Sequence, residues 1–361
     1  MSWNKHRIQR KYMSWNKHRI KIQLDTTTHC NAKCPMCHRT DPKGLDRVDW
    51  LPLTQWTLDD FKKAFNPDDL KLIAHFSFTP TWGDAMMSNH TKGMIEYIFK
   101  HNSLCSVSID TNGSIRDEDW WWEFGLISKG GKYNLIVKFD VDGTTQEMHE
   151  KYRQGTDLQK VLNNMRAFAE TKSKAYVQTI VFKHNQLYLS DIEKLIKEYG
   201  ASQHIHVYSD RFDRGIDTFD FTDTNGNIQT LEKADLPIDN ENYKNKVAKI
   251  NENIKCSWGE LNEISISFDG QVHPCCYFSN AYDRKDRLFL DKPLMKSYSN
   301  QEKKLNIFHN TLSEIINHQW IKKELPDSWV SEKPINQCIR HCSSKNKLPD
   351  YFRDYIPIKP I

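Results

Sequence analysis

The sequence lacks any long apolar run. None of its 361 residues lies in a stretch approaching the ~18 consecutive apolar residues that a membrane-spanning helix needs. A charged-then-apolar secretory signal is also missing, so we expect neither a membrane protein nor a secreted one. A disorder-prone composition is absent too, because 27% of the residues are charged and 12% are aromatic. At ~100–200 residues per domain, the length predicts two or three folded domains.

Acidic residues are missing from the first 24 positions, which carry seven of the 51 Lys and Arg side chains. The rest of the chain has 44 basic residues against 47 acidic ones, so its net charge is slightly negative. Nucleic acid is therefore not an expected partner of the body of the protein. The octapeptide MSWNKHRI occurs twice, at 1–8 and 13–20. We expect 1–19 to be a basic arm and the first copy of the octapeptide to be dispensable.

The cysteines are odd in number and clustered. There are nine: Cys30, Cys34, Cys37, Cys105, Cys256, Cys275, Cys276, Cys338 and Cys342. Without a secretory signal, this pattern predicts metal ligation in a reducing, cytoplasmic compartment rather than disulfides. Cys105 opens an apolar strand and is interpreted as a small buried hydrophobic residue.

Strand-like and helix-like segments alternate over residues 20–213. The strands are expected at 20–24, 72–78, 105–110, 134–141, 175–182 and 204–208. The helices are expected at 57–65, 91–101, 117–128, 157–171 and 189–199. Thr57 and Ser190 are expected to begin helices, Ser190 with a capping box to Glu193. Six alternations predict a parallel sheet with crossover helices, either open or closed into a partial barrel, with its site at the carboxyl ends of the strands.

The pattern fades at 214–255, which is interpreted as a linker. A second unit is expected at 256–345, with a hairpin turning at Asp269-Gly270 and a helix at 311–324. The tail at 346–361 is expected to be extended.

Three cysteines directly after the first strand give the strongest chemical signal. Cys30, Cys34 and Cys37 form a CxxxCxxC loop. Three thiolates on one short loop can hold three irons of a cubane cluster and leave the fourth iron open. His38 offers a fourth ligand for zinc, so a zinc site is the alternative, although structural zinc usually takes paired CxxC knuckles.

This loop resembles the signature of the radical S-adenosylmethionine (radical SAM) superfamily. The resemblance implies a partial (β/α)6 TIM-like barrel and a 4Fe–4S cluster on these three cysteines. It implies that S-adenosylmethionine (AdoMet) chelates the open iron through its amino and carboxylate groups. It also implies reductive cleavage of AdoMet, hydrogen abstraction by a 5′-deoxyadenosyl radical, and an electron donor such as a flavodoxin.

Further motifs resemble that family in the same order. Trp82-Gly83-Asp84 resembles its GGEP motif, Thr111-Asn112-Gly113 its ribose-side TNG segment, and the run from Phe139 to Gly143 its FSIDG segment. The resemblance implies that the AdoMet-binding residues are Gly83, Asp84, Thr111, Asn112, Asp140 and Arg153. The alternative for each motif is an ordinary turn or a surface residue.

Two carboxylates are expected on one face of the fourth strand. Asp140 and Asp142 are two positions apart at its carboxyl end, which makes them candidate catalytic residues. A helix cap or a solvated loop would explain them equally well.

The later cysteines resemble a second, C-terminal motif. Cys256 is followed by Gly270, then Cys275 after four residues, and later by Cys338 and Cys342. This resembles the SPASM/Twitch extension, and four cysteines imply the shorter Twitch form, a small α+β domain with one auxiliary 4Fe–4S cluster. Zinc is again the alternative. On an extended chain Cys276 points away from Cys275, so it is not expected to join the same ligand set.

These patterns predict an oxidising radical SAM enzyme whose auxiliary cluster takes the second electron from the substrate. A peptide or protein substrate is favoured over a small alcohol. A redox-neutral outcome such as epimerisation, served by Asp140 or Asp142, is the second hypothesis. A zinc-stapled nucleic-acid-binding protein is the third. The sequence itself names no substrate.

Metal analysis separates these classes. After anaerobic reconstitution we expect roughly eight irons and matching sulfide, falling to about four when Cys30, Cys34 and Cys37 are all replaced by Ala. Iron and sulfide assays on both proteins check this. Zinc without sulfide in either protein would contradict the enzyme hypothesis.

Overall fold

The structure is a computed structural model. It describes residues 20–79, 81–209, 211–212, 216–235, 254, 256–286, 290–331, 334–342 and 352–357. The expected arm at 1–19 and part of the expected linker at 214–255 lie outside these ranges. Over the described ranges, no helix is long and apolar enough to cross a membrane.

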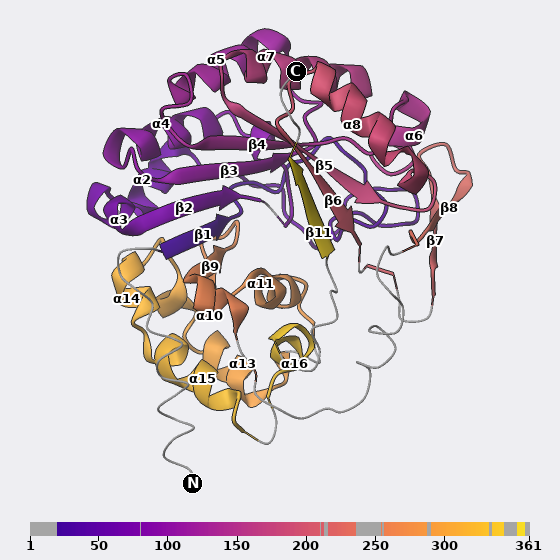
Figure 1. The fold of residues 1–361 in the computed structure, drawn as a ribbon. Coiled ribbons are helices and arrows are strands. Elements are labelled where there is room, and N and C mark those ends of the chain that lie inside the picture. The colour runs from indigo at the N-terminus through magenta and orange to yellow at the C-terminus, as the bar shows by residue number, and fades with distance from the viewer. Residues whose placement is uncertain are drawn as a thin grey trace.

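A nine-stranded sheet forms the centre of the molecule, in the order β10-β9-β1-β2-β3-β4-β5-β6-β11 (Figure 1). Six consecutive strands run parallel: β1 (Ile20–Leu24), β2 (Ile73–Phe78), β3 (Ser106–Thr111), β4 (Leu135–Asp140), β5 (Lys174–Val181) and β6 (Gln203–Tyr208). All six predicted strands are confirmed to within one residue at each end. Parallel neighbours require crossover connections, which the intervening helices supply.

Seven helices belong to these crossovers: α2 (Leu58–Ala64), α3 (Pro67–Leu72), α4 (Thr91–His101), α5 (Glu118–Gly125), α6 (Gln146–Glu150), α7 (Leu158–Glu170) and α8 (Leu189–Glu198). Thr57 begins α2 with a capping box to Asp60. The expected cap at Ser190 is wrong. A 3-10 turn, η3 (Gln186–Tyr188), leads into α8, whose N-cap Tyr188 makes no side-chain cap, so Ser190 already lies inside the helix.

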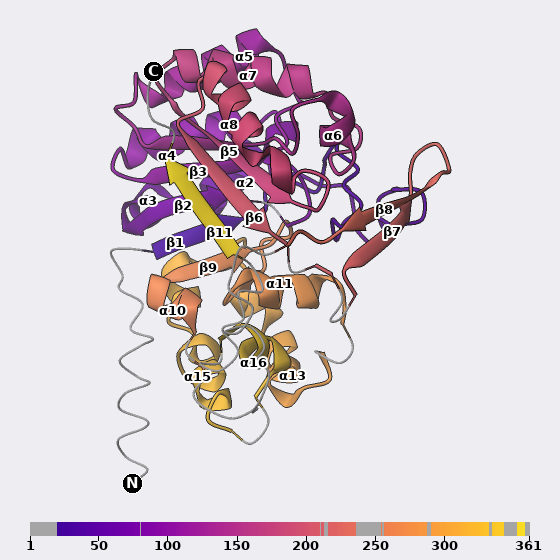
Figure 2. The ribbon, with the colours of Figure 1, turned by 45° about the vertical axis from the view of Figure 1, so that its right-hand side comes forward.

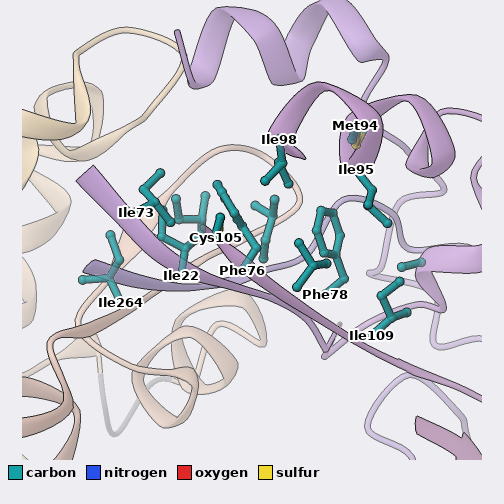
Figure 3. Packing of buried hydrophobic residues seen from close by; sticks show 14 of the residues in the cluster. Ile22, Ile73, Phe76, Phe78, Met94, Ile95, Ile98, Cys105, Ile109 and Ile264 are labelled. Carbon is teal, nitrogen blue, oxygen red and sulfur yellow. The ribbon is translucent and has the colours of Figure 1, made fainter. Parts of the chain in front are cut away.

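The sheet has one apolar and one polar face, because successive side chains on a strand point to opposite sides. On the apolar face Ile22, Phe76 and Val107 lie side by side in register and are fully buried. They pack among residues such as Ile95 and Ile98 of α4 (Figure 3). Burial of each large apolar side chain contributes about 1.5–3 kcal/mol, so this layer holds the helices on the sheet.

The opposite face carries polar groups in matching rows. The register aligns Lys21 with His75, and Asp140 with Gln178. Between them, Asp110 lies beside Lys138 and forms an ion pair with it. Several of these residues are only half-buried, so this face is available for contacts with a bound molecule.

The C-terminal unit extends the same sheet. β9 (Glu263–Ile266) pairs parallel to β1, and β10 (Val272–His273) folds back on β9 about Asp269-Gly270, which confirms the predicted hairpin. Gly270 has a φ of +81°, and a Cβ there would lie 2.4 Å from the Phe308 ring. The rest of the unit is helical, with α10 (Ser257–Leu261), α11 (Cys276–Asp283), α13 (Pro293–Ser299), α14 (Leu312–Ile316), α15 (Leu325–Ser328) and α16 (Asn336–Cys342).

Two sequence expectations about the C-terminal half differ from the structure. A single helix at 311–324 is wrong, because α14 ends at Ile316 and a π-helical turn, η5 (Trp320–Glu324), follows. Asn317 ends α14 by donating its side-chain amide to the carbonyl of Ser313 at 2.8 Å. The expected extended tail is confirmed where it is described, as β11 (Phe352–Pro357), antiparallel to β6.

A hairpin also forms within the segment interpreted as a linker. β7 (Thr218–Thr222) and β8 (Ile228–Glu232) pair antiparallel and project from the side of the sheet (Figure 2). Phe221 and Leu231 are buried together with Leu45 and Met36. The hairpin therefore packs on the loop that carries the first three cysteines.

Candidate active site at the carboxyl edge of the sheet

The three-cysteine loop lies directly after β1. Cys34 is buried, and Cys30 and Cys37 are half-buried. The Lys33 amide donates to the carbonyl of Gln154 at 2.8 Å, which ties this loop to the segment after β4. The loop is therefore held at the edge of the sheet where the parallel strands end.

Polar donors approach two of the sulfurs. The Asn112 side-chain amide lies 3.8 Å from Cys30 Sγ, and Arg153 Nη1 lies 3.9 Å from Cys34 Sγ. Burial raises the pKa of Cys34 to about 12, an effect that Arg153 partly offsets. Burial, with the nearby Asp84 carboxylate, also raises the pKa of Cys30. These thiols hold their protons until a metal displaces them.

The turn after β2 packs against the start of this loop. A Cβ on Gly83 would lie 2.2 Å from the carbonyl oxygen of Thr27, so only glycine fits. The Asp84 amide donates to the His29 carbonyl at 2.8 Å. Arg39, on the cysteine loop, donates through Nε to the Trp82 carbonyl at 3.1 Å. The turn and the loop thus form one backbone assembly.

Asp84 then reaches the end of β3. Its buried carboxylate accepts hydrogen bonds from the Thr111 hydroxyl at 3.0 Å and from both the amide and the side chain of Asn112 at 2.9 and 2.8 Å. Burial raises the pKa of Asp84 even so. The side chain of Asn112 also donates to Asn31 Oδ1 at 2.8 Å. Four of the residues expected to bind AdoMet, Gly83, Asp84, Thr111 and Asn112, therefore meet beside Cys30.

Asp140 and Asp142 both pair with Arg153. Arg153 Nη1 lies 2.8 Å from Asp140, and Arg153 Nε lies 2.6 Å from Asp142. Asp142 is completely buried and also accepts the Ile180 amide at 2.7 Å. Burial raises the pKa of Asp140 to about 7 against the opposing effect of Arg153. Arg153 Nη2 is buried and, among the described residues, finds no hydrogen-bond partner, so it can receive an anionic group.

The later cysteines share one cavity in the C-terminal unit. It is small, with a volume of about 10 Å³, and its lining includes Cys256, Cys275, Cys338 and Cys342. Cys338 and Cys342 are four residues apart on α16, which places them on one helical face. Cys276 is not among the residues lining this cavity.

Both cysteine sets offer thiolates, which bind either the irons of a cubane cluster or a single zinc ion. Over the described residues, no three His, Cys, Asp or Glu side chains are placed to hold one metal ion. His38, the alternative zinc ligand, has its ring 6.4 Å from that of Trp82. Both cysteine sets are compatible with iron–sulfur ligation.

Outside this site, Cys105, Trp121 and His204 are buried. Cys105 is buried, as expected. Of the three consecutive tryptophans, Trp121 is fully buried while Trp122 is exposed. His204 bonds to the Thr179 hydroxyl at 2.8 Å. Sequence reasoning missed Arg39 and the pairing of Arg153 with the two aspartates, because neither has a local signal in the chain.

Replacement of Gly83 by Ala tests the packing of the turn. Because the new Cβ would strike the Thr27 carbonyl, we expect the free energy of unfolding to fall by about 1–3 kcal/mol, measured by equilibrium urea denaturation. Gly93 on α4 is the matched control, since a Cβ there meets only the flexible Leu58 side chain at 3.3 Å. Equal destabilisation by the two substitutions would contradict the packing described here.

Comparison with known proteins finds similarity at the level of the fold. No family model matches the sequence, and no curated protein matches it significantly. Among solved structures, His6-tagged anSMEcpe with bound AdoMet is 15% identical, with a TM-score of 0.51 over 87% of this chain and 81% of that chain. Native anSMEcpe with bound AdoMet is 15% identical, with a TM-score of 0.50 over 90% and 89%. Streptococcus suis SuiB is 11% identical, with a TM-score of 0.49 over 82% and 72%.

The likeness at this level of identity concerns the fold. The mostly parallel sheet with its crossover helices is similar to the α/β fold of the two anSMEcpe structures and consistent with a partial barrel, which confirms the predicted fold class. The chain shares its fold with AdoMet-binding radical SAM enzymes.

Proposed function

We propose that the protein is a radical SAM enzyme. The observation that carries the proposal is the convergence, at one edge of the sheet, of Cys30, Cys34 and Cys37 with Asp84 and Asn112 on one side and Arg153 on the other. A reduced 4Fe–4S cluster held by Cys30, Cys34 and Cys37 would supply the electron for reductive cleavage of AdoMet, and thereby the means of hydrogen abstraction from the substrate.

Each neighbouring residue has a distinct task in this proposal. Arg153 Nη2 receives the carboxylate of AdoMet, because it is buried and has no other partner among the described residues. The backbone of the Gly83 turn receives the amino group. Asn112, held by Asp84, lies on the ribose side and donates toward Cys30.

Asp140 and Asp142 act by positioning in this proposal. Their carboxylates fix two nitrogens of Arg153 and so aim the third. The single guanidinium offsets one of the two negative charges, and the raised pKa of Asp140 limits the other. An epimerase would need a residue that returns a proton to the substrate. Asp142 is disfavoured for this because its carboxylate is fully buried and accepts hydrogen bonds from Arg153 and from the Ile180 amide.

The C-terminal cysteines serve electron transfer in this proposal. Cys256, Cys275, Cys338 and Cys342 would fill all four positions of an auxiliary 4Fe–4S cluster, which would accept the second electron from the substrate. The proposed substrate is a peptide or protein. The polar face of the sheet supports this, because groups such as Gln178 and Lys138 offer donors and acceptors to a polar chain. A flavodoxin-type protein is the proposed electron donor.

Two cysteine substitutions separate the proposed clusters. Cys30→Ala removes a ligand of the AdoMet site, and we expect loss of dithionite-dependent 5′-deoxyadenosine formation, measured by chromatography under anaerobic conditions. Cys342→Ala leaves that site intact, so we expect cleavage to persist while the iron content falls by about four per chain.

Cys105→Ala is the control for loss of a thiol. Cys105 is buried in the apolar core, so this variant keeps both the full iron content and AdoMet cleavage. Unchanged cleavage in Cys30→Ala, or unchanged iron in Cys342→Ala, would contradict the proposal.

A further inference from the structure

A long-range hydrogen bond links the C-terminal unit to the turn at residues 81–84. The Trp82 side chain is completely buried, and its indole Nε1 donates to Asp283 Oδ2 at 2.8 Å. Trp82 directly precedes Gly83 and Asp84, the residues proposed to receive AdoMet. The position of this turn is therefore fixed in part by a residue that lies 201 positions later in the chain.

Asp283 is itself firmly held. It is the last residue of α11, and its Oδ2 also accepts the hydroxyls of Ser267 at 3.0 Å and Ser279 at 3.2 Å. The N-cap of the same short helix is Cys275, which lines the cysteine cavity. α11 therefore connects the cavity at one end to Trp82 at the other.

The backbone of the turn is fixed from the opposite side. Asp25, which follows β1, accepts the amide of Thr81 at 2.5 Å. Asp25 is almost fully buried, and burial together with the charge of Asp283 raises its pKa. Asp25 holds the backbone and Asp283 holds the side chain, so the turn has little freedom to shift.

We propose that Asp283 is a positioning residue for AdoMet, acting through the Trp82 indole on the Gly83–Asp84 turn. This inference rests on the proposed function of that turn. Loss of the acceptor would leave a buried indole N–H unsatisfied, and the turn would move to satisfy it. Such a movement would disturb the hydrogen bonds between Asp84 and Asn112, so the affinity for AdoMet would fall. In this proposal Asp283 acts through Trp82 and does not itself contact AdoMet.

AdoMet dissociation constants test this on anaerobically reconstituted protein by equilibrium dialysis. We expect Asp283→Ala and Trp82→Phe each to weaken binding about tenfold, the effect of losing one charge-assisted hydrogen bond. Asp283→Asn keeps an oxygen that accepts the indole N–H, so it restores affinity to near the wild-type value. The double variant Trp82→Phe/Asp283→Ala binds no more weakly than Trp82→Phe alone, because both act through one bond.

The chain offers a matched control. Trp56 also donates its indole Nε1 across to the C-terminal unit, to the carbonyl of Phe268 at 2.7 Å, but it does not adjoin the turn. Trp56→Phe therefore loses an equivalent long-range bond and keeps the wild-type AdoMet affinity. Thermal melting of every variant follows overall stability separately.

The outcomes distinguish this inference from the function on which it rests. Wild-type affinity in both Trp82→Phe and Asp283→Ala would overturn this inference but leave the proposed function standing. Additive losses in the double variant would have the same meaning. An equal loss in Trp56→Phe would also overturn it, since the effect would then be general. If the wild-type protein bound no AdoMet, the proposed function would be overturned first.

Discussion

The carboxylate of Asp84 is the acceptor around which the candidate site is assembled. It is buried, and removal of a charge from water costs several kcal/mol unless donors replace the solvent. The donors come from Thr111 and Asn112 at the end of β3, whereas Asp84 itself follows β2. This one group therefore fixes the spacing of two loops, and Asn112 in turn is directed at the cysteine loop after β1. Backbone hydrogen bonds already join the turn after β2 to the cysteine loop, and the Asp84 carboxylate adds the end of β3 to that assembly.

Arg153 has the complementary place on the other side of the loop. Its positive charge lies between Asp140 and Asp142 and faces Cys34. A buried cation near buried thiols makes their deprotonation less costly, although burial still dominates the pKa of Cys34. The guanidinium that forms ion pairs with the two carboxylates is therefore also placed to stabilise the Cys34 thiolate once a metal is bound. An acidic group, Asp84, therefore lies beside Cys30, and a cation, Arg153, lies beside Cys34 on the same loop.

The sequence allowed prediction of features that depend on short-range patterns. Strands such as 20–24 and 204–208 follow from alternation, since one face must be apolar to hold the helices. The cysteine spacings pointed to two ligand sets, because their signal is local. The prediction of a helix cap at Ser190 was wrong, because the 3-10 turn η3 starts helical structure before that residue. The pairing of Trp82 with Asp283 could not be foreseen, because 201 positions separate the two residues and only the folded chain brings them together.

The place of β1 in the sheet has a consequence for synthesis. β1 lies between β2 and β9, and Lys21 pairs with both His75 and Glu263. During translation one edge of β1 therefore stays without its partner until β9 (Glu263–Ile266) has emerged, on the order of tens of seconds at typical elongation rates. An open strand edge is a template for unwanted pairing with other chains. For that interval the nascent chain exposes an unpaired strand edge, which is an expected site of aggregation.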